Sequence, residues 1–532
     1  MTRNAVTPRG PRITTRGLVA LSAVTALAFT GCTTASNSNT GAGGAGSTDT
    51  IRSILTTDPL GFSPWEASGF DDYLVNGLMF APLVYKDDGN SFIPGLASEW
   101  ETSSERVEFT IRDDATCGDG SPVTPSIVAA SLTEFQKTSN VFGGPTFGPA
   151  APTISGDDAA GVVTVELAQP WSDVLSGVSL PSAGIVCSAG FDDPDALVAG
   201  TLDAAVTGPY TLTEKQPGVK YEFTLREGYN LWPEYAEPLT GTPAQTMVYT
   251  IATSSSAVAN ELITGTLDAS LISGKDIERL EADASLTTER LPSANMFVIF
   301  NEREGSLFAD IDKRRAVAQA LDREAFNQAT NGGLGDLAAS YALPAVPCFN
   351  TDEALLVETD PTAAAAQLAG LKIRLLGSQN FGPNGAGNTY IADALRETGA
   401  EVELLNLDNA SWAETGQLKP EAWDVAVFGN INASATMSGV MGLFSGAPTE
   451  DGGANWTGNP DERAQQYLRD AMAEPDETKR CDIYQEAQRY AMTEQVRAVP
   501  LSTLASLVAA RDGFSFRAPN KSNMNYAMRI ED

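Results

Sequence analysis

The chain has 532 residues, enough for roughly three or four domain-sized units, and it is strongly acidic, with 68 Asp and Glu against 34 Lys and Arg. A net charge of −34 makes nucleic acid and anionic membrane surfaces poor partners. The sequence contains no histidine, which excludes Ser-His-Asp and Cys-His catalysis, histidine-ligated metals and a histidine proton shuttle. Carboxylates alone offer no specific active site, because chance pairs are common among so many acidic residues.

The first 32 residues have the pattern of a targeting segment. Four arginines precede the apolar run 18–30, which is too short to span a bilayer as a stable anchor. The run ends in FTGC, which resembles a bacterial lipobox, with Phe29 where leucine is usual. We therefore expect a signal peptide over residues 1–32 and lipidation of Cys32; an ordinary secretory signal is the alternative.

Residues 33–49 are rich in Gly, Ser, Thr and Asn, and they bury little apolar surface. Such a segment is expected to form a flexible tether. A coil of about 17 residues has a mean reach of roughly 20–25 Å. The folded part of the chain is expected to begin near residue 50.

Alternating strands and turns follow between residues 81 and 136. Residues 107–111 alternate apolar and polar side chains, the two-residue period of a half-buried strand. Thr124 and Pro125 have the positions of an N-cap and a first helical residue. The predicted helix carries one apolar face, formed by Val128, Leu132 and Phe135. This order of elements predicts an α/β scaffold and indicates no function.

The remainder of the chain continues the mixture of strands and helices. An opening strand that runs into a turn is expected over 51–64, and further strands are expected at 162–167, 247–251, 296–301, 371–376, 402–405 and 424–428. Helices are expected at 71–80, 257–263, 390–397, 462–473 and 477–494, and the last strands are expected to run through Arg529. Asp312 is expected to cap a further helix. The loop 382–389 has the glycine spacing of a phosphate loop, but Asn388 replaces the required lysine, so it is interpreted as a strand-to-helix loop.

Five cysteines occur in the chain, and four remain if Cys32 is lipidated: Cys117, Cys187, Cys348 and Cys481. An even number in an oxidising compartment permits two disulfides, and the sequence leaves all three pairings open. No pair has C-x-x-C spacing, which argues against zinc or thioredoxin chemistry. No metal and no cofactor are expected.

The stretch from residue 82 to 132 resembles the signature of the extracellular solute-binding protein family 5, the peptide-, nickel- and oligosaccharide-binding receptors of ABC importers. The matching residues include PLVY, PGLASEWE and DGSPVTP. Similar segments at 207–232, 301–324 and 455–501 extend the resemblance over nearly all of residues 50–532.

The resemblance implies an α/β fold of the two-lobed periplasmic-binding-protein type II, with an extra subdomain in the first lobe. The expected boundaries are 50–67, 207–300 and 497–532 for the core of the first lobe, 68–206 for its extra subdomain, and 301–496 for the second lobe. This division favours the disulfides 117–187 and 348–481, because each pair then lies within one lobe.

The resemblance also implies a receptor that is not an enzyme. It is expected to be a monomer anchored by lipid outside the cell membrane, where it captures a peptide or peptide-like solute by hinge closure and delivers it to permease subunits. An oligosaccharide or another polar solute is the alternative ligand. A secreted, carboxylate-dependent hydrolase is a distant alternative.

Peptide-binding members of the family hold the peptide's α-ammonium with an aspartate, where residues 428–436 of this chain contain no acid. A buried ammonium without a carboxylate would cost several kcal/mol. We therefore expect Asn430 and Asn432 to recognise neutral polar groups, or else to shape a turn. Trp412 and Trp456 are candidate stacking platforms, with burial in the core as the alternative.

Overall fold

The computed structural model describes residues 49–67, 69–139, 142–431, 433–519 and 527–531, all within the unit Ser47–Asp532. The expected signal peptide, the lipidated Cys32 and nearly all of the tether lie outside these residues, as does Asn432. Within the described ranges, no helix combines the length and the apolar character that crossing a membrane requires.

One four-stranded antiparallel sheet contains the alternating strand expected at residues 107–111. Its order is β4 (Ala97–Thr102), β5 (Arg106–Ile111), β7 (Val162–Glu166) and β6 (Thr153–Asp157). Val107, Phe109 and Ile111 are buried, which confirms the predicted period. The sequence did not predict β6, because Ile154 is the only large apolar residue in this strand and no alternation is visible.

Helix α2 (Pro125–Thr138) packs against this sheet and begins as predicted. The Thr124 hydroxyl accepts a hydrogen bond from the Ile127 amide at 3.4 Å. The expected apolar face is buried, since Val128, Leu132 and Phe135 have almost no exposed surface. The hairpin of β2 (Val84–Lys86) and β3 (Phe92–Pro94) precedes the sheet.

A second four-stranded sheet has the order β1 (Thr50–Leu55), β10 (Thr246–Ile251), β9 (Lys220–Leu225) and β8 (Tyr210–Gln216). The chain's first described strand therefore pairs in parallel with a strand almost 200 residues later. The short hairpin of β17 (Phe514–Arg517) and β18 (Ala527–Ile530) makes an isolated bridge from Ile530 to Thr242, close to this sheet.

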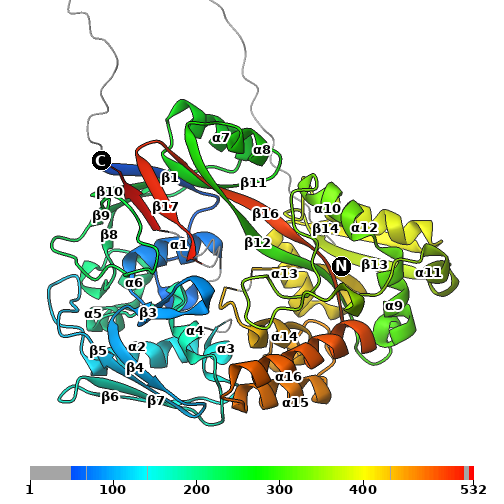
Figure 1. Cartoon of the computed structure of the whole chain (residues 1–532), viewed down its shortest axis with the longest axis horizontal. Helices are drawn as coiled ribbons and strands as arrows, with labels where there is room; N and C mark the ends of the chain where they lie inside the picture. The colour runs from blue at the N-terminus through cyan, green and yellow to red at the C-terminus, as the bar shows by residue number, and fades with distance from the viewer. Residues whose placement is uncertain (1–48, 68, 140–141, 432, 520–526, 532) are drawn as a thin grey trace, which may run out of the picture. The chain divides into compact units, whose positions relative to one another are not determined.

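The largest sheet has six strands and is built around two long ones, as Figure 1 shows. Its order is β11 (Ala269–Ser273), β16 (Ala498–Arg511), β12 (Leu286–Phe300), β15 (Val425–Asn430), β13 (Lys372–Ser378) and β14 (Glu401–Leu407). The antiparallel ladder between β12 and β16 has two register shifts, at Pro292–Ala294 and Met296–Phe297. Such irregularities bend a strand pair locally. The last three strands of this order pair in parallel, since β13 lies between β15 and β14 and pairs in parallel with both.

Helices cover the sheets and connect their strands. The longer ones are α1 (Phe70–Met79), α7 (Ser255–Thr264), α9 (Ile311–Ala320), α10 (Arg323–Asn331), α11 (Pro361–Leu368), α12 (Ala386–Glu397), α13 (Asn409–Leu418), α14 (Met437–Ser445), α15 (Glu462–Ala473) and α16 (Glu477–Arg489). The short ones are α3 (Gly143–Phe147), α4 (Val174–Val178), α5 (Ser188–Asp192), α6 (Pro194–Ala199) and α8 (Ile277–Glu281).

The starts of α9 and α12 differ from the prediction for identifiable reasons. Asp310, rather than Asp312, is the N-cap of α9, and its carboxylate accepts from the Asp312 amide at 3.0 Å. Helix α12 begins at Ala386, four residues earlier than predicted, because Gly385 adopts a φ of +72° just before it. The buried Asn388 is then part of the helix and donates to the Ser378 carbonyl at 2.8 Å, so it supports the loop.

The structure forms both of the disulfides that the resemblance favoured. Cys117 is bonded to Cys187 and Cys348 to Cys481, with sequence separations of 70 and 133 residues. Each bond closes a long loop, which restricts the unfolded chain.

A buried ion network lies where β12 ends and β16 begins. Arg497 is 2.9 Å from Asp461 and 3.5 Å from Glu302, and Arg314 is 3.7 Å from Glu302. Burial raises the pKa of the Glu302 carboxyl, although both arginines act in the opposite direction. These four side chains join the ends of the long strands to α9 and to the N-cap of α15.

Candidate functional site

The two tryptophans singled out in the sequence lie together in an aromatic cluster beside β15. The Trp412 and Trp456 rings are 4.9 Å apart, and the Phe428 ring is 4.9 Å from that of Trp456. Both tryptophans are buried, and the Trp412 indole N–H donates to the Val427 carbonyl at 3.3 Å. In this arrangement the rings pack on one another as core residues; their role as stacking platforms stays a prediction.

Amide side chains meet where β15 ends. Asn430 is opposite Asn295 of β12 in the ladder and is partly exposed. Asn295 is buried and donates to the Ser340 carbonyl at 2.9 Å, while its Oδ1 atom has no hydrogen-bond partner among the described residues. The strand thus ends beside an unsatisfied buried acceptor, which a bound polar group would satisfy.

Hydrogen bonds between described residues join the expected extra subdomain to the expected second lobe. Lys86 Nζ donates to the Ala435 carbonyl at 3.4 Å, and the Ser172 hydroxyl donates to the Met472 carbonyl at 2.7 Å. The Ser438 hydroxyl donates to the Asp173 carboxylate. These segments are hundreds of residues apart in sequence, so only the folded chain brings them together.

Lys86 and Asp173 are electrostatically unusual. Burial lowers the pKa of the Lys86 ammonium to about 8, although the negative charge of Asp173 acts in the opposite direction. Burial likewise raises the pKa of the Asp173 carboxyl, against the hydrogen bond from Ser438 and the positive charges of Lys86 and Arg480. Both side chains nevertheless keep some exposed surface. Strong desolvation together with residual exposure is expected of groups that line a narrow cleft, and it marks candidate functional sites.

Two buried tyrosines add unsatisfied hydroxyls to the same region. The hydroxyls of Tyr341 and Tyr484 have no hydrogen-bond partner among the residues that the structure describes. Burial raises the pKa of the Tyr484 phenol well above its usual value, and the charge of Asp173 adds to the shift. The Tyr341 ring packs edge-on against Phe444 of α14, with centroids 4.7 Å apart.

A separate aromatic group surrounds Arg529 of β18. Its guanidinium lies over the Trp232 ring, 4.3 Å from the centroid, and no carboxylate among the described residues lies within ion-pair distance of it. Burial lowers the pKa of Arg529, while burial of Tyr85 and Tyr235 raises theirs. This group joins β18 to the β2 strand that also carries Lys86.

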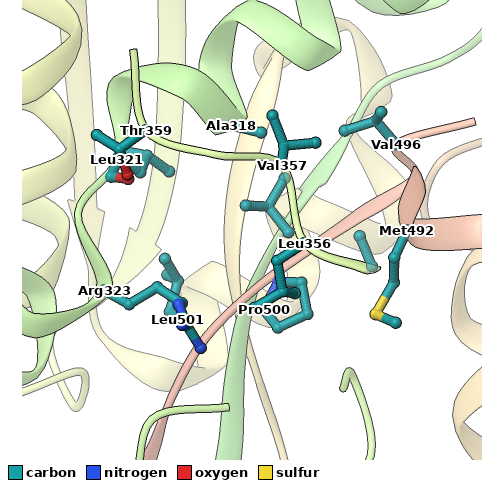
Figure 2. Close-up of a pocket in the computed structure, with 12 residues that line it drawn as sticks. Ala318, Leu321, Arg323, Leu356, Val357, Thr359, Met492, Val496, Pro500 and Leu501 are labelled. Atoms are coloured by element: carbon teal, nitrogen blue, oxygen red, sulfur yellow. The ribbon is translucent and has the colours of Figure 1, made fainter. Parts of the chain in front are cut away.

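The cavities differ in their capacity for a solute. The pocket in Figure 2, which α9 and the start of β16 help to line, has a volume of about 40 Å³ and would hold only a few water molecules. A groove of about 730 Å³ is large enough for a small molecule and includes Pro292, at the register shift of β12. Arg517 in that groove is already paired with Asp88 at 2.7 Å and with Glu237 at 3.1 Å.

Residues 91–451 match the family model described as bacterial extracellular solute-binding proteins, family 5. The chain belongs to this family. Membership confirms the recognition made from the sequence and places the chain among non-enzymatic solute receptors.

Solved structures of similar proteins confirm the expected periplasmic-binding-protein fold. A substrate-binding protein of Microbacterium hydrocarbonoxydans, complexed with 4-hydroxybenzoate hydrazide, is 39% identical; the match covers 91% of this chain and 100% of that one, with a TM-score of 0.82. AgaA of A. tumefaciens R10, in complex with agropinic acid, is 20% identical; the match covers 91% of this chain and 99% of that one, with a TM-score of 0.76. The latter likeness concerns the fold alone.

Two sequence relatives match at lower identity than the Microbacterium protein. Protein XP55 of Streptomyces lividans is 27% identical over 336 residues, which are 62% of this chain and 59% of that protein. The probable D,D-dipeptide-binding periplasmic protein DdpA of Escherichia coli K12 is 23% identical over 463 residues, 81% of this chain and 84% of its own.

Sequence reasoning missed Lys86, Asp173, Tyr341 and Tyr484. Lys86 directly follows the PLVY residues and Tyr484 lies within the similar segment 455–501, but the resemblance assigned no ligand role to these positions. No pattern in the sequence singled out Asp173 or Tyr341. The signal is their shared burial without full pairing, which exists only in the folded protein.

Proposed function

We propose that this family 5 protein is the membrane-tethered solute receptor of an ABC importer. It captures a small solute between two lobes and delivers it to permease subunits, and it acts as a monomer. The observation that carries the proposal is the family match over residues 91–451. The proposed lobes keep the boundaries expected from the sequence. The first lobe consists of 50–67, 207–300 and 497–532 together with the subdomain 68–206, and the second lobe consists of 301–496.

The proposed hinge is the β12–β16 pair. This pair is supported as the hinge because its two long strands connect β11, which pairs with β16, to β15, which pairs with β12. Its register shifts at 292–294 and 296–297 interrupt the ladder between those ends. The hydrogen bonds of Lys86 and Asp173 to the α14 segment are of the kind that closure would form.

The proposed ligand is a small peptide-like solute, meaning one with an amide-type group, that needs no free ammonium. The absence of an acid from residues 428–436 supports this class. The 39% identical Microbacterium protein is complexed with an aromatic acyl hydrazide, which contains an amide-type C(=O)–N–H unit and is uncharged at neutral pH.

A thermal-shift and calorimetric screen tests this proposal. The solutes are 4-hydroxybenzoate hydrazide, 4-hydroxybenzoate, free and N-acetylated dipeptides, and oligosaccharides. A true ligand at 100 times its Kd should stabilise the protein by about 2.7 kcal/mol. Binding of oligosaccharides alone would favour the alternative receptor, and binding of free-amine peptides but not N-acetylated ones would contradict the neutral-group proposal.

The site residues chosen from the sequence are tested in the same assay. Replacing Asn430 and Asn432 together by alanine should weaken binding by at least about 1–2 kcal/mol if they face the solute. Trp412→Phe or Trp456→Phe should weaken the binding of an aromatic solute if the replaced indole stacks on that solute. Unchanged affinities would place the site elsewhere.

The membrane tether is proposed to be a lipid on Cys32. The position of Cys32, directly after an apolar run and before a Gly- and Ser-rich segment, supports this. Cys32→Ala should release the protein from membranes. If the variant partitions into detergent as the wild type does, lipidation at this cysteine is wrong.

A further inference from the structure

A polar site lies between β2, α4, α14 and α16. Lys86 ends β2, and Asp173 immediately precedes α4. Opposite them are Ala435 and Ser438, around the first turn of α14. Tyr484 in α16 is close enough to Asp173 for the negative charge of that carboxylate to act on its phenol. The site therefore draws one side from the proposed subdomain and the other from the proposed second lobe.

Neither charge in this site is paired by contact. Among the residues that the structure describes, no carboxylate lies within 4.0 Å of the Lys86 ammonium and no cation lies that close to the Asp173 carboxylate. Lys86 makes one long hydrogen bond to a carbonyl, and Asp173 accepts one from Ser438. An ammonium has three protons and a carboxylate about four acceptor positions, so both retain capacity for a ligand.

The buried network at Glu302 shows what this chain does with charges that are only structural. There, Arg497 is within ion-pair distance of both Glu302 and Asp461, and Arg314 is within ion-pair distance of the same Glu302 oxygen. Desolvated charges are ordinarily compensated in this way. Lys86 and Asp173 depart from that pattern, because neither charge has an oppositely charged partner within ion-pair distance among the described residues.

The unsatisfied Tyr484 hydroxyl is a second and independent sign of a ligand. Tyr484 is 4% exposed, and its hydroxyl has no partner among the described residues. A buried hydroxyl without a hydrogen bond costs about 1–3 kcal/mol. A ligand group that reached this position would recover that cost.

We propose that Lys86, Asp173 and Tyr484 form a subsite that binds a neutral ligand group with a hydrogen-bond acceptor beside a donor, such as a carboxamide or acyl hydrazide. The acceptor faces Lys86, and the donor faces Asp173. A cationic group is disfavoured by Lys86 and an anionic group by Asp173, whereas a neutral dipolar group is complementary to both. This inference rests on the proposed function and deepens it, because a ligand held here contacts both lobes and favours closure.

The test compares the affinities of charge-altered variants by isothermal calorimetry. Lys86→Met removes a charged donor, and Asp173→Asn replaces a charged acceptor by a neutral one. Each should weaken binding of 4-hydroxybenzoate hydrazide about tenfold or more. Lys372→Met and Asp113→Asn, both at exposed positions, are the matched controls and should leave the affinity unchanged. Lys86→Gln, which keeps the stem and a donor, replaces Lys86→Met if that variant does not fold.

The variants should also change preference according to the sign of the charge removed. Relative to the hydrazide, the anion 4-hydroxybenzoate should gain in Asp173→Asn and lose in Lys86→Met, a reversal that a general loss of packing would not produce. If the wild type binds the hydrazide and the variants match their controls, the subsite is wrong and the proposed function stands. If the wild type binds none of the screened solutes, the proposed function itself is contradicted.

Discussion

Gly416 of α13 packs directly beneath Trp456, and a single added methyl group tests this arrangement. An ideal Cβ at Gly416 would lie 1.8 Å from Trp456 Cζ3 and 2.2 Å from Cε3. The indole cannot simply move away, because the rings of Trp412 and Phe428 each lie 4.9 Å from its own. Gly416→Ala should therefore force the aromatic cluster to repack.

The size of the effect follows from a comparison with Gly442→Ala in α14. Both substitutions gain about 1 kcal/mol of helix propensity. A Cβ at Gly442 has no atom within 4 Å, so that gain should remain, whereas Gly416→Ala should pay about 1–3 kcal/mol for overpacking. The propensity terms cancel, and the two variants should differ in unfolding free energy by about 1–3 kcal/mol.

Urea unfolding followed by tryptophan fluorescence measures this difference. The native spectrum of Gly416→Ala should also shift, because Trp412 and Trp456 change their surroundings, while that of Gly442→Ala should match the wild type. Equal midpoints and equal spectra for the two variants would refute the close packing of Trp456 on α13.

Three further predictions concern stability. Replacing Cys348 and Cys481 by serine should lower the unfolding free energy by about 2–5 kcal/mol, because the bond closes a loop with a sequence separation of 133 residues; urea midpoints equal to those of the oxidised wild type would contradict this. Arg497→Met should cost about 3–5 kcal/mol, since it leaves Glu302 and its neighbouring carboxylate buried with one arginine fewer, and a melting temperature equal to the wild type's would argue against the network. Burial lowers the pKa of Lys86 from 10.5 to about 8, so between these pH values the unfolded chain binds one more proton at Lys86 than the folded chain does. The free energy of unfolding should therefore rise with pH in this range. In urea titrations Lys86→Met should lose that rise, and identical pH profiles for variant and wild type would contradict the shift.

The sequence by itself determined the family, the α/β class and many local elements. The period of residues 107–111 and the Thr124 cap are encoded by neighbours in the chain, so they could be predicted without a fold. The disulfide partners followed once the resemblance divided the chain into lobes, since each pair then fell within one lobe. All of these conclusions rest on local patterns or on their order along the chain.

Only the tertiary structure decided which polar groups share a site. Lys86 contacts Ala435 and Asp173 contacts Ser438 from positions hundreds of residues away, and the incomplete pairing of the two charges depends on burial, which no local pattern encodes. It likewise packed Trp412 against Trp456, a contact between α13 and a distant loop. The physical reason is that periods and caps depend on adjacent residues, whereas desolvation and charge compensation depend on everything that surrounds a group in space.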